Sequence, residues 1–338
     1  MERRTLLGLA AATAAGVWGG SARADGPDTV TVGGIQLPTN APLFIAMDKG
    51  YFAKQGIKVD VTWFTAAAAV FTAVVSRDVD VGMTGTTAAT FNLAAKGGFK
   101  IIGGTTLDAP HFPLNGVLVS NKAWDAGFTS LKEMGGKRWA MTTAGSTHHY
   151  DIGLMARKYG VPLSAMQLVP LEAYGNITAA LQSGQVDAAI LPPALVGRML
   201  DAKSARFLAW TGDEAPEQQG IVCASPATIA RRHDVLARFM RAYVEGASEY
   251  NRVFNQVDAS GRPVKGPDQA PLLDIIARGA NIKPAEAEAA VAFILPDLRP
   301  DEADIRRQIA FWQDAGLVSR SADFKDLFDL SLLPAKAA

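Results

Sequence analysis

Short apolar runs alternate along the chain with longer stretches in which apolar residues recur at helical spacing. In the first third, runs typical of β-strands occupy residues 30–35, 59–64, 79–83 and 100–105. Apolar positions three and four residues apart predict helices between them, over residues 41–47, 66–76 and 87–96. This alternation is typical of βαβ units, so we expect an α/β fold with largely parallel sheets.

The same rhythm repeats after a proline-rich connection, DAPHFP at residues 108–113. It predicts strands over residues 116–120, 138–142, 167–171 and 187–191, and helices over residues 146–159 and 177–182. The apolar run GIVCA at residues 220–224 is expected to return the chain to the first half. Beyond it we predict helices over residues 236–254, 272–278, 285–295 and 301–315. We therefore expect one lobe from residues 28–112 and 216–330 and a second lobe from residues 113–215.

The first 24 residues have the pattern of an export signal. Arg3 and Arg4 precede an apolar run over residues 6–18, and Ala22-Arg23-Ala24 provides a small-residue cleavage site. The paired arginines resemble a twin-arginine signal, and the general secretion route stays open as the alternative. We expect a soluble periplasmic protein once residues 1–24 are removed.

Composition narrows the function classes. The chain has 338 residues, with 33 basic and 33 acidic side chains, so it lacks the basic excess of a nucleic-acid-binding protein. A single cysteine, Cys223, excludes a disulfide framework and a multi-thiolate zinc site, and we expect it to be a buried structural residue. The motifs of P-loops and zinc proteases are also missing from the sequence. We expect no cofactor, no bound metal and no nucleic-acid partner.

Two segments place small hydroxyl or glycine residues between a buried strand and a helix start. They read VGMTGTTA at residues 81–88 and WAMTTAGSTHH at residues 139–149. A helix N-terminus exposes N–H groups and partial positive charge, so both segments could hold an anion, one from each lobe. The alternative is that their threonines and serine only cap the helices. Because these segments contain no Arg or Lys, a monoanion or a neutral polar ring suits them better than a doubly charged ligand.

Other polar residues near predicted strand ends join the candidate site. His148 or its neighbour His149 is expected to face the cleft, and His111 and Tyr174 are further candidates. Gln36 and Asn40 follow the first strand and could either bind a ligand or serve as caps.

Several segments resemble the periplasmic solute-binding proteins of ABC importers for nitrate, alkanesulfonates, taurine and thiamine-pyrimidine precursors. They are APLFIAMDKGYF (residues 41–52), QGIKVD (55–60), VDVG (79–82), LKEMGGKR (131–138) and LQSGQVDA (181–188). The resemblance implies a two-lobed periplasmic binding protein fold of type II, each lobe a mostly parallel sheet flanked by helices. It also implies capture of a small solute by lobe closure, docking on a permease in the inner membrane, and a monomer.

The resemblance and the loop chemistry together give a set of ligand-binding candidates. They are Gln36, Asn40, Thr65, Thr86, Thr87, His111, Thr147, His148, Tyr174 and Pro192. At Pro192-Pro193 the sequence departs from the family, which often has tryptophan and an acid before the proline, and this leaves the ligand open.

We favour a small organic anion, a sulfonate or an aromatic carboxylate, over nitrate, because the candidate site is rich in aromatic and apolar side chains. Binding of nitrate or of a thiamine-pyrimidine precursor is the alternative. An enzyme of the same fold, such as a desulfinase, would need Cys223 beside His111 or His148. A binding protein that serves a membrane sensor is a further alternative.

Overall fold

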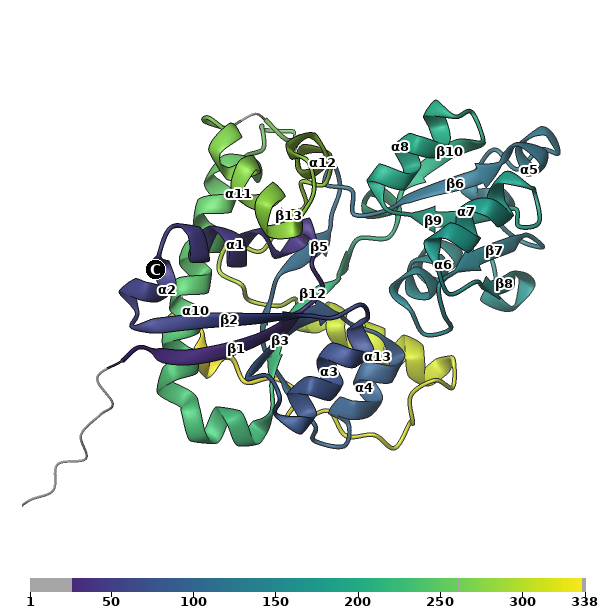
Figure 1. Cartoon of the computed structure of the whole chain (residues 1–338). Helices are drawn as coiled ribbons and strands as arrows, with labels where there is room; N and C mark the ends of the chain where they lie inside the picture. The colour runs from purple at the N-terminus through teal and green to yellow at the C-terminus, as the bar shows by residue number, and fades with distance from the viewer. Residues whose placement is uncertain (1–25, 261, 265, 336–338) are drawn as a thin grey trace, which may run out of the picture.

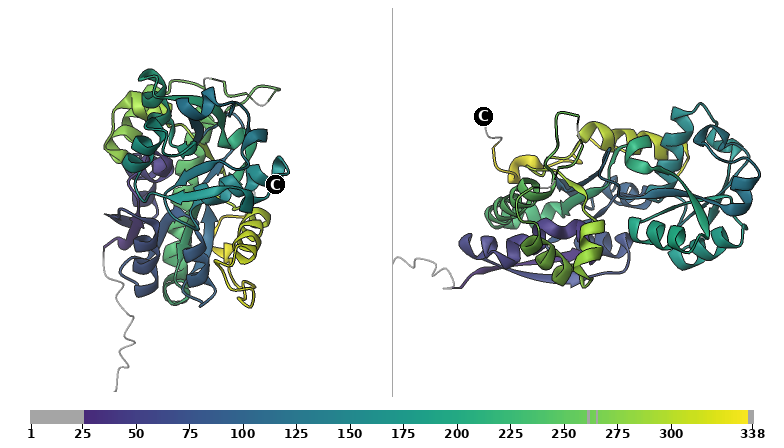
Figure 2. Two further views of the ribbon diagram at one scale, coloured as in Figure 1. Left: turned by 90° about the vertical axis from the view of Figure 1, so that its right-hand side faces the viewer. Right: turned by 90° about the horizontal axis from the view of Figure 1, so that it is seen from above.

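Two five-stranded sheets form the cores of two lobes that lie side by side (Figures 1 and 2). The computed structural model describes residues 26–260, 262–264 and 266–335. The predicted export signal, residues 1–24, lies outside the described residues. Within them, no helix combines the length and the apolar character needed to cross a membrane.

The sheet of lobe 1 has the order β2-β1-β3-β12-β4. Its strands are β1 (Asp28–Gly34), β2 (Ile57–Trp63), β3 (Val81–Gly85), β4 (Lys100–Gly104) and β12 (Gly220–Ala224). Strand β1 runs parallel to β2 and β3, whereas β12 runs antiparallel to β3 and β4. Val30, Val32 and Val81 are fully buried, so the apolar runs of these strands form the centre of the lobe.

Helices cover both faces of this sheet (Figure 1). They are α1 (Ala41–Asp48), α2 (Tyr51–Lys54), α3 (Ala67–Ser76), α4 (Ala88–Ala94), α10 (Pro226–Phe254), α11 (Ala270–Ala280), α12 (Pro284–Ala289) and α13 (Glu302–Asp314). Helices α1, α10 and α11 share one hydrophobic cluster, and α3, α4 and α13 share another. The long helix α10 is kinked at Arg232, whose guanidinium binds Asp80 at 2.6 Å. Short 3₁₀ turns occupy Pro38–Asn40, Leu131–Glu133, Leu163–Ala165 and Leu330–Leu332.

The sheet of lobe 2 has the order β10-β6-β9-β7-β8. Its strands are β6 (Gly116–Ser120), β7 (Arg138–Met141), β8 (Gln167–Pro170), β9 (Ala188–Leu191) and β10 (Ala205–Trp210). Its helices are α5 (Asn121–Asp125), α6 (Thr147–Lys158), α7 (Tyr174–Gln182), α8 (Pro193–Asp201) and α9 (Thr211–Glu214). Strand β7 is parallel to β8 and β9, and β6 is antiparallel to β9 and β10.

A third, three-stranded sheet joins the lobes. It has the order β11-β5-β13 and consists of β5 (Thr106–Asp108), β11 (Glu217–Gln218) and β13 (Phe293–Ile294). The chain leaves lobe 1 after β5 and re-enters it at β11, so both crossings begin or end in this sheet. The helix predicted over residues 285–295 is wrong in its second half: α12 ends at Ala289, and Phe293 pairs with Leu107 and contacts the ring of Phe112.

The lobes also touch through α6 of lobe 2 and α13 of lobe 1. The His149 ring lies 5.3 Å from Trp312, and Tyr150 lies 5.1 Å from Phe311, measured between ring centroids. Gly153 permits this approach, because a Cβ there would fall 2.3 Å from the Phe311 ring. Aromatic packing therefore fixes the start of α6 against lobe 1.

The structure confirms the two-lobed α/β fold class. The sheet of each lobe is mostly parallel, as predicted, but the first of its strands after a crossing runs against the other four. Strand β12 brings the chain back into lobe 1 antiparallel to its neighbours, and β6 does the same in lobe 2.

Candidate functional site

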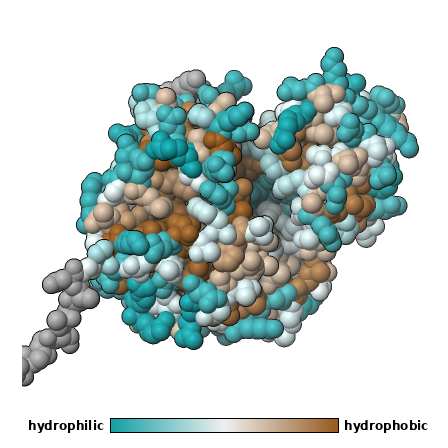
Figure 3. All heavy atoms as spheres, in the orientation of Figure 1, coloured by the Kyte–Doolittle hydropathy of each residue, from teal (hydrophilic) through white to brown (hydrophobic). Residues whose placement is uncertain are grey.

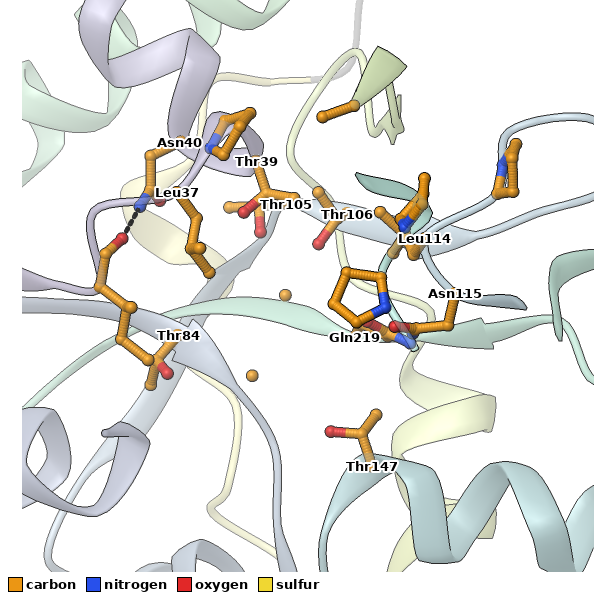
Figure 4. A pocket seen from close by; sticks show the side chains of 18 of the residues that line it. Leu37, Thr39, Asn40, Thr84, Thr105, Thr106, Leu114, Asn115, Thr147 and Gln219 are labelled. Atoms are coloured by element: carbon orange, nitrogen blue, oxygen red, sulfur yellow. Dashed lines mark hydrogen bonds between the residues drawn. The ribbon is translucent and has the colours of Figure 1, made fainter. Parts of the chain in front are cut away.

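A cavity of about 320 Å³ opens between the two lobes, where the space-filling view shows a hollow (Figure 3). Its lining comes from both lobes and from the connecting sheet. The lining residues are Ile35, Leu37, Pro38, Thr39, Asn40, Met83, Thr84, Gly85, Thr105, Thr106, Pro113, Leu114, Asn115, Thr147, His148, Tyr174, Pro192, Pro193, Gln219, Gly220 and Ala290. Thr84 of β3 and Thr147 at the start of α6 lie on different sides of this cavity (Figure 4).

The described lining contains no Asp, Glu, Lys or Arg. Hydroxyl and amide groups supply its polarity, and His148 and Tyr174 are its ionisable side chains. Leucine, proline and methionine side chains supply apolar surface. The cavity can therefore hold a small molecule by hydrogen bonds and apolar contact, and it has no permanent cation for a doubly charged anion.

Five predicted site residues line the cavity, namely Asn40, Thr147, His148, Tyr174 and Pro192. Asn40 is held in place by a 2.7 Å hydrogen bond from its Nδ2 to the carbonyl of Ile35, drawn in Figure 4. The structure thus brings together one residue from lobe 1 and four from lobe 2.

The other five predicted residues lie outside the cavity, each for a local reason. Gln36 turns away and donates to the carbonyl of Gly279 at 2.8 Å. Thr65 is exposed, and Thr86 is buried with its hydroxyl donating to Gln308 Oε1 at 2.6 Å. Thr87 forms a capping box with Thr90. His111 is exposed on the surface, in a left-handed turn with φ +68°.

We expected the starts of α4 and α6 to bind one ligand together, but the hydrogen-bond partners of their first N–H groups differ. At α4, the N–H of Ala88 donates to the carbonyl of Gly145 at 3.0 Å, and Thr87 caps Thr90. At α6, the Ser146 hydroxyl accepts from the N–H of His149. The N–H groups of Thr147 and His148 have no acceptor within the helix, because they belong to its first turn. Of these two helix starts, the start of α6 is the one that borders the cavity with unpaired N–H groups.

The candidate list omits six polar residues of the lining, of which Thr84 alone lies in a segment that the sequence analysis singled out for the site; the six are Thr39, Thr84, Thr105, Thr106, Asn115 and Gln219. Asn115 directly precedes β6 and Gln219 directly precedes β12. Both therefore stand where the chain passes from one lobe to the other, and a residue at such a crossing faces the space between the lobes. The predicted crossings at residues 108–113 and 220–224 were the signal that could have found them.

Three buried polar atoms of the lining lack a hydrogen-bond partner among the described residues. They are Thr84 Oγ1, His148 Nδ1 and Gln219 Nε2. Because buried polar groups are normally paired, three orphans around one cavity indicate that a molecule entering it can supply their partners.

His148 is neutral in this environment. Burial lowers the pKa of its imidazole to about 4, and the side chain is only 5% exposed. Its ring lies 5.8 Å from that of Tyr174. Desolvation raises the pKa of the Tyr174 hydroxyl to about 12, with a smaller contribution from Asp151, although 36% of the residue is exposed.

Four buried carboxyl groups lie behind the cavity, one turn beyond His148 and around the connecting sheet. They belong to Asp108, Asp151, Glu217 and Asp304. Asp304 accepts hydrogen bonds from Gln218, Gln308 and Arg307. No described donor reaches the carboxyl oxygens of Asp151 or Glu217.

Burial and the neighbouring carboxyl groups favour the protonated form of three of these acids, Asp108, Asp151 and Glu217. The pKa of Asp108 rises to about 7 through burial, offset in part by hydrogen bonds from Thr211 and Leu114. Burial and the neighbouring carboxyls raise the pKa of both Asp151 and Glu217 well above the usual range. A neutral acid pair therefore lies between lobe 2 and the connecting sheet.

Comparison with known proteins identifies the family. The family model described as NMT1/THI5 like matches residues 38–251. The chain belongs to the NMT1/THI5-like family. A search of curated protein sequences finds no match to it.

Solved structures similar to this NMT1/THI5-like protein confirm its fold. The alkanesulfonate-binding protein SsuA from Xanthomonas axonopodis pv. citri bound to MOPS is 20% identical, with a TM-score of 0.64 over 88% of this chain and 96% of that one. The periplasmic nitrate-binding protein NrtA from Synechocystis PCC 6803 is 13% identical, with a TM-score of 0.60 over 88% and 84% of the two chains. The desulfurization enzyme DSZB is 15% identical, with a TM-score of 0.60 over 90% and 97%.

The cysteine of this NMT1/THI5-like protein lies away from the cavity. Cys223 is fully buried in β12, and burial raises the pKa of its thiol. It packs in the cluster shared by α3, α4 and α13, and it is not among the lining residues. A nucleophile beside a base, which the enzyme alternative required of Cys223, is therefore not formed in the described structure.

Proposed function

We propose that the protein is the solute-binding component of an ABC importer and that it captures a small organic anion, a sulfonate or an aromatic carboxylate, between its lobes. The observation that carries this proposal is the cavity of about 320 Å³ that borders the start of α6 and contains three unpartnered polar atoms. Helix N-termini bind anions through free N–H groups and partial positive charge.

The size and chemistry of the cavity favour an organic monoanion. Its volume falls in the range of about 300–1,000 Å³ typical of small-molecule sites, and much of its lining is apolar. An inorganic ion such as nitrate would leave that apolar surface uncovered. Since no lysine or arginine lines the described cavity, one negative charge is the most that it accommodates well.

The site is proposed to work by lobe closure. A solute that contacts both Thr84 of lobe 1 and Thr147 of lobe 2 would favour the closed arrangement by its higher affinity for it. The closed form would dock on a permease in the inner membrane, the protein acting as a monomer in the periplasm after export. The periplasmic sulfonate- and nitrate-binding proteins of similar fold support this proposal.

A thermal-shift screen of the chain from Asp25 onward tests the proposal. The panel consists of alkanesulfonates, taurine, benzoate, benzenesulfonate, nitrate and aminopyrimidines, after unfolding and refolding to remove carried-over ligand. A ligand at about 100 times its Kd stabilises by roughly 2.7 kcal/mol, which gives a clear shift in Tm. We expect the organic anions to give the largest shift. Failure of every compound would contradict the proposed function.

A neutral polar ring, such as a thiamine-pyrimidine precursor, is the second candidate. The uncharged lining and the neutral His148 beside Tyr174 favour it. A large shift with aminopyrimidines and none with sulfonates or carboxylates would select this candidate.

A further inference from the structure

His148 is the one described lining residue that can become a cation at moderately acidic pH. It lies in the first turn of α6, a helix of 12 residues, and 95% of its surface is buried. Its Nδ1 is buried without a partner in the described structure, and the residue belongs to the lining of a cavity that also contains hydrogen-bond donors. Its neighbour His149 differs in this respect, because His149 Nδ1 accepts a hydrogen bond from the N–H of Gly145 at 3.1 Å.

We propose that His148 takes up one proton from solvent as the solute binds, and that the resulting imidazolium ion holds the anionic group of the solute. This inference rests on the proposed function, since it requires an anionic solute. The step forms one N–H bond on the imidazole, with hydronium or a buffer acid as the proton donor, and changes no bond in the solute. His148 thereby becomes the specificity-determining residue that distinguishes an anion from its neutral analogue.

The groups around His148 explain why it is neutral before the solute binds. Tyr174 on α7 faces its ring, and Asp151 lies one turn further along α6. Glu217 of β11, Asp108 of β5 and Asp304 of α13 lie beyond Asp151. Asp151 and Glu217 are held in their neutral form by burial, and Asp304 is paired with Arg307. No fixed negative charge therefore contacts the imidazole, and burial alone sets its protonation state.

An incoming anion changes this balance. An opposite charge within about 4–6 Å raises the pKa of a histidine by one to three units. The bound-state pKa then lies above the free-state pKa of about 4. Affinity for the anion accordingly rises as pH falls through the bound-state pKa, and it levels off below the free-state pKa.

Thr84 Oγ1 and Gln219 Nε2 complete the set of groups around the anion. Both atoms are buried and unpartnered, and they belong to lobe 1 and to the chain segment that returns to lobe 1. Each can donate a hydrogen bond to an oxygen of the solute. With His148 from lobe 2, the three donors would converge on the anionic group from both sides of the cavity.

Isothermal titration calorimetry tests the proposal with two matched pairs of probes, benzoate with benzamide and benzenesulfonate with benzenesulfonamide. Titrations in pairs of cationic buffers whose ionisation enthalpies differ measure proton uptake, with bis-Tris and imidazole at about pH 6 and triethanolamine and Tris at about pH 8. Sulfonate and other small-anion buffers would compete for the site. At about pH 6 we expect the anion to bind with a substantial fraction of one proton taken up, falling toward zero at about pH 8. The neutral amides should bind at least tenfold more weakly, with no uptake.

Variants show whether His148 is the group that takes up the proton. His148→Asn should abolish both proton uptake and the pH dependence of binding, and should weaken anion binding about tenfold or more. His233→Asn, on the exposed face of α10, is the matched control and should behave like the unchanged protein. The Tm and circular dichroism of each variant verify its folding.

The outcomes separate this inference from the proposed function. Anion binding without uptake at about pH 6, or uptake that persists in His148→Asn, overturns the inference and leaves solute binding intact. Tighter binding of a neutral amide than of the matching anion would also overturn the inference and leave solute binding intact. Failure of all four probes at both pH values overturns the inference, and failure of the wider thermal-shift panel overturns the proposed function. Nitrogen-15 NMR of the free protein gives an independent check, because a protonated His148 at about pH 6.5 would also contradict the proposal.

Discussion

The backbone N–H of Ala88, the first residue of α4 in lobe 1, donates to the carbonyl of Gly145, in the loop before α6 of lobe 2, at 3.0 Å. This bond uses a donor of one helix start to position the loop that leads to the other. The two helix starts therefore do not share one ligand. The start of α4 contributes a contact between the lobes, and the start of α6 remains available to the cavity.

Gly145→Ala should disturb this contact between the lobes. Gly145 has φ +82°, and a Cβ there would lie 2.9 Å from the Cβ of Ala88. We expect a loss of about 2–3 kcal/mol in the free energy of unfolding, since strain in a left-handed residue accounts for about 1–2 kcal/mol and the close contact adds to it. Urea unfolding measures the loss. Gly127→Ala is the control, because Gly127 has φ +97° with no neighbour within 4 Å; equal losses in the two variants would contradict the role of the contact.

The buried acid pair predicts that stability falls as pH rises. Asp151 and Glu217 have folded-state pKa values well above the ordinary range near 4, so at higher pH the folded state binds more protons than the unfolded state. The free energy of unfolding should then decrease by up to about 1.4 kcal/mol per pH unit for each group across that interval. Urea unfolding at several pH values from about 5 to about 8.5 measures the slope.

The variant Glu217→Gln tests whether the buried acid pair causes the pH dependence of the free energy of unfolding. The variant keeps the shape of a protonated glutamic acid but does not titrate, so we expect a shallower pH dependence than in the unchanged protein. Glu302→Gln, at an exposed position on α13, should leave the slope as it is. An unchanged slope in Glu217→Gln would show that the pair does not titrate in this range.

Thr211→Val should destabilise the connection between the lobes. The Thr211 hydroxyl contacts the buried Asp108 carboxylate and lies 2.8 Å from the carbonyl of Asn115. Its removal leaves one oxygen of Asp108 without this donor, and we expect a cost of about 1–3 kcal/mol. Because the pKa of Asp108 is about 7, the cost should be larger at about pH 8 than at about pH 6, where the acid is mostly neutral. Thermal unfolding at both pH values checks this, with Thr72→Val on the exposed face of α3 as control.

Cys223 should be inert in the folded protein. It is fully buried, and burial raises the pKa of its thiol, so both access and thiolate formation are suppressed. We expect no reaction with a thiol-specific disulfide reagent under native conditions and one equivalent in denaturant. Rapid labelling of Cys223 under native conditions would contradict its burial and would support the alternative that the protein is an enzyme.

Thr84→Val tests the cavity itself. Valine has nearly the same shape as threonine but lacks the unpartnered Oγ1. We expect affinity for the solute selected by the thermal-shift screen to fall about five- to tenfold, with little change in Tm of the free protein. Calorimetry measures the affinity, and Thr72→Val again serves as control. An unchanged affinity would remove Thr84 from the set of contacts.

The parts of the fold predicted from the sequence are those with strong periodicity. The runs at residues 116–120 and 220–224 match β6 and β12 because each is almost entirely apolar and bounded by turns or polar residues. Strand β11 consists of Glu217 and Gln218, and no pattern of apolar residues indicates such a strand. This strand forms because it pairs with β5. In that pair Glu217 lies opposite Asp108, which is 109 positions earlier in the sequence. Only the folded structure brings these residues together.

The sequence predicts that residues at helix starts between the lobes form the site, but it does not predict which of those residues line the cavity. Residues at the start of α6 line the cavity because that helix follows the sheet edge that meets the other lobe. Thr86 and Thr87 belong to an equivalent segment, yet Gln308 and Thr90 take their hydrogen bonds. Gln308 lies 222 residues away from Thr86, so its competition could not be foreseen from local sequence.

The two paired crossing strands also determine how the molecule can move. Strands β5 and β11 are hydrogen-bonded side by side, with Asp108 opposite Glu217 and Leu107 opposite Gln218. Two coupled strands resist sliding past each other and resist independent twisting, and they bend most easily about an axis that lies across both. We therefore expect the lobe rotation that closure requires to follow mainly one direction. One pair of spectroscopic labels, placed on the outer ends of the two lobes, would follow the whole motion as one distance.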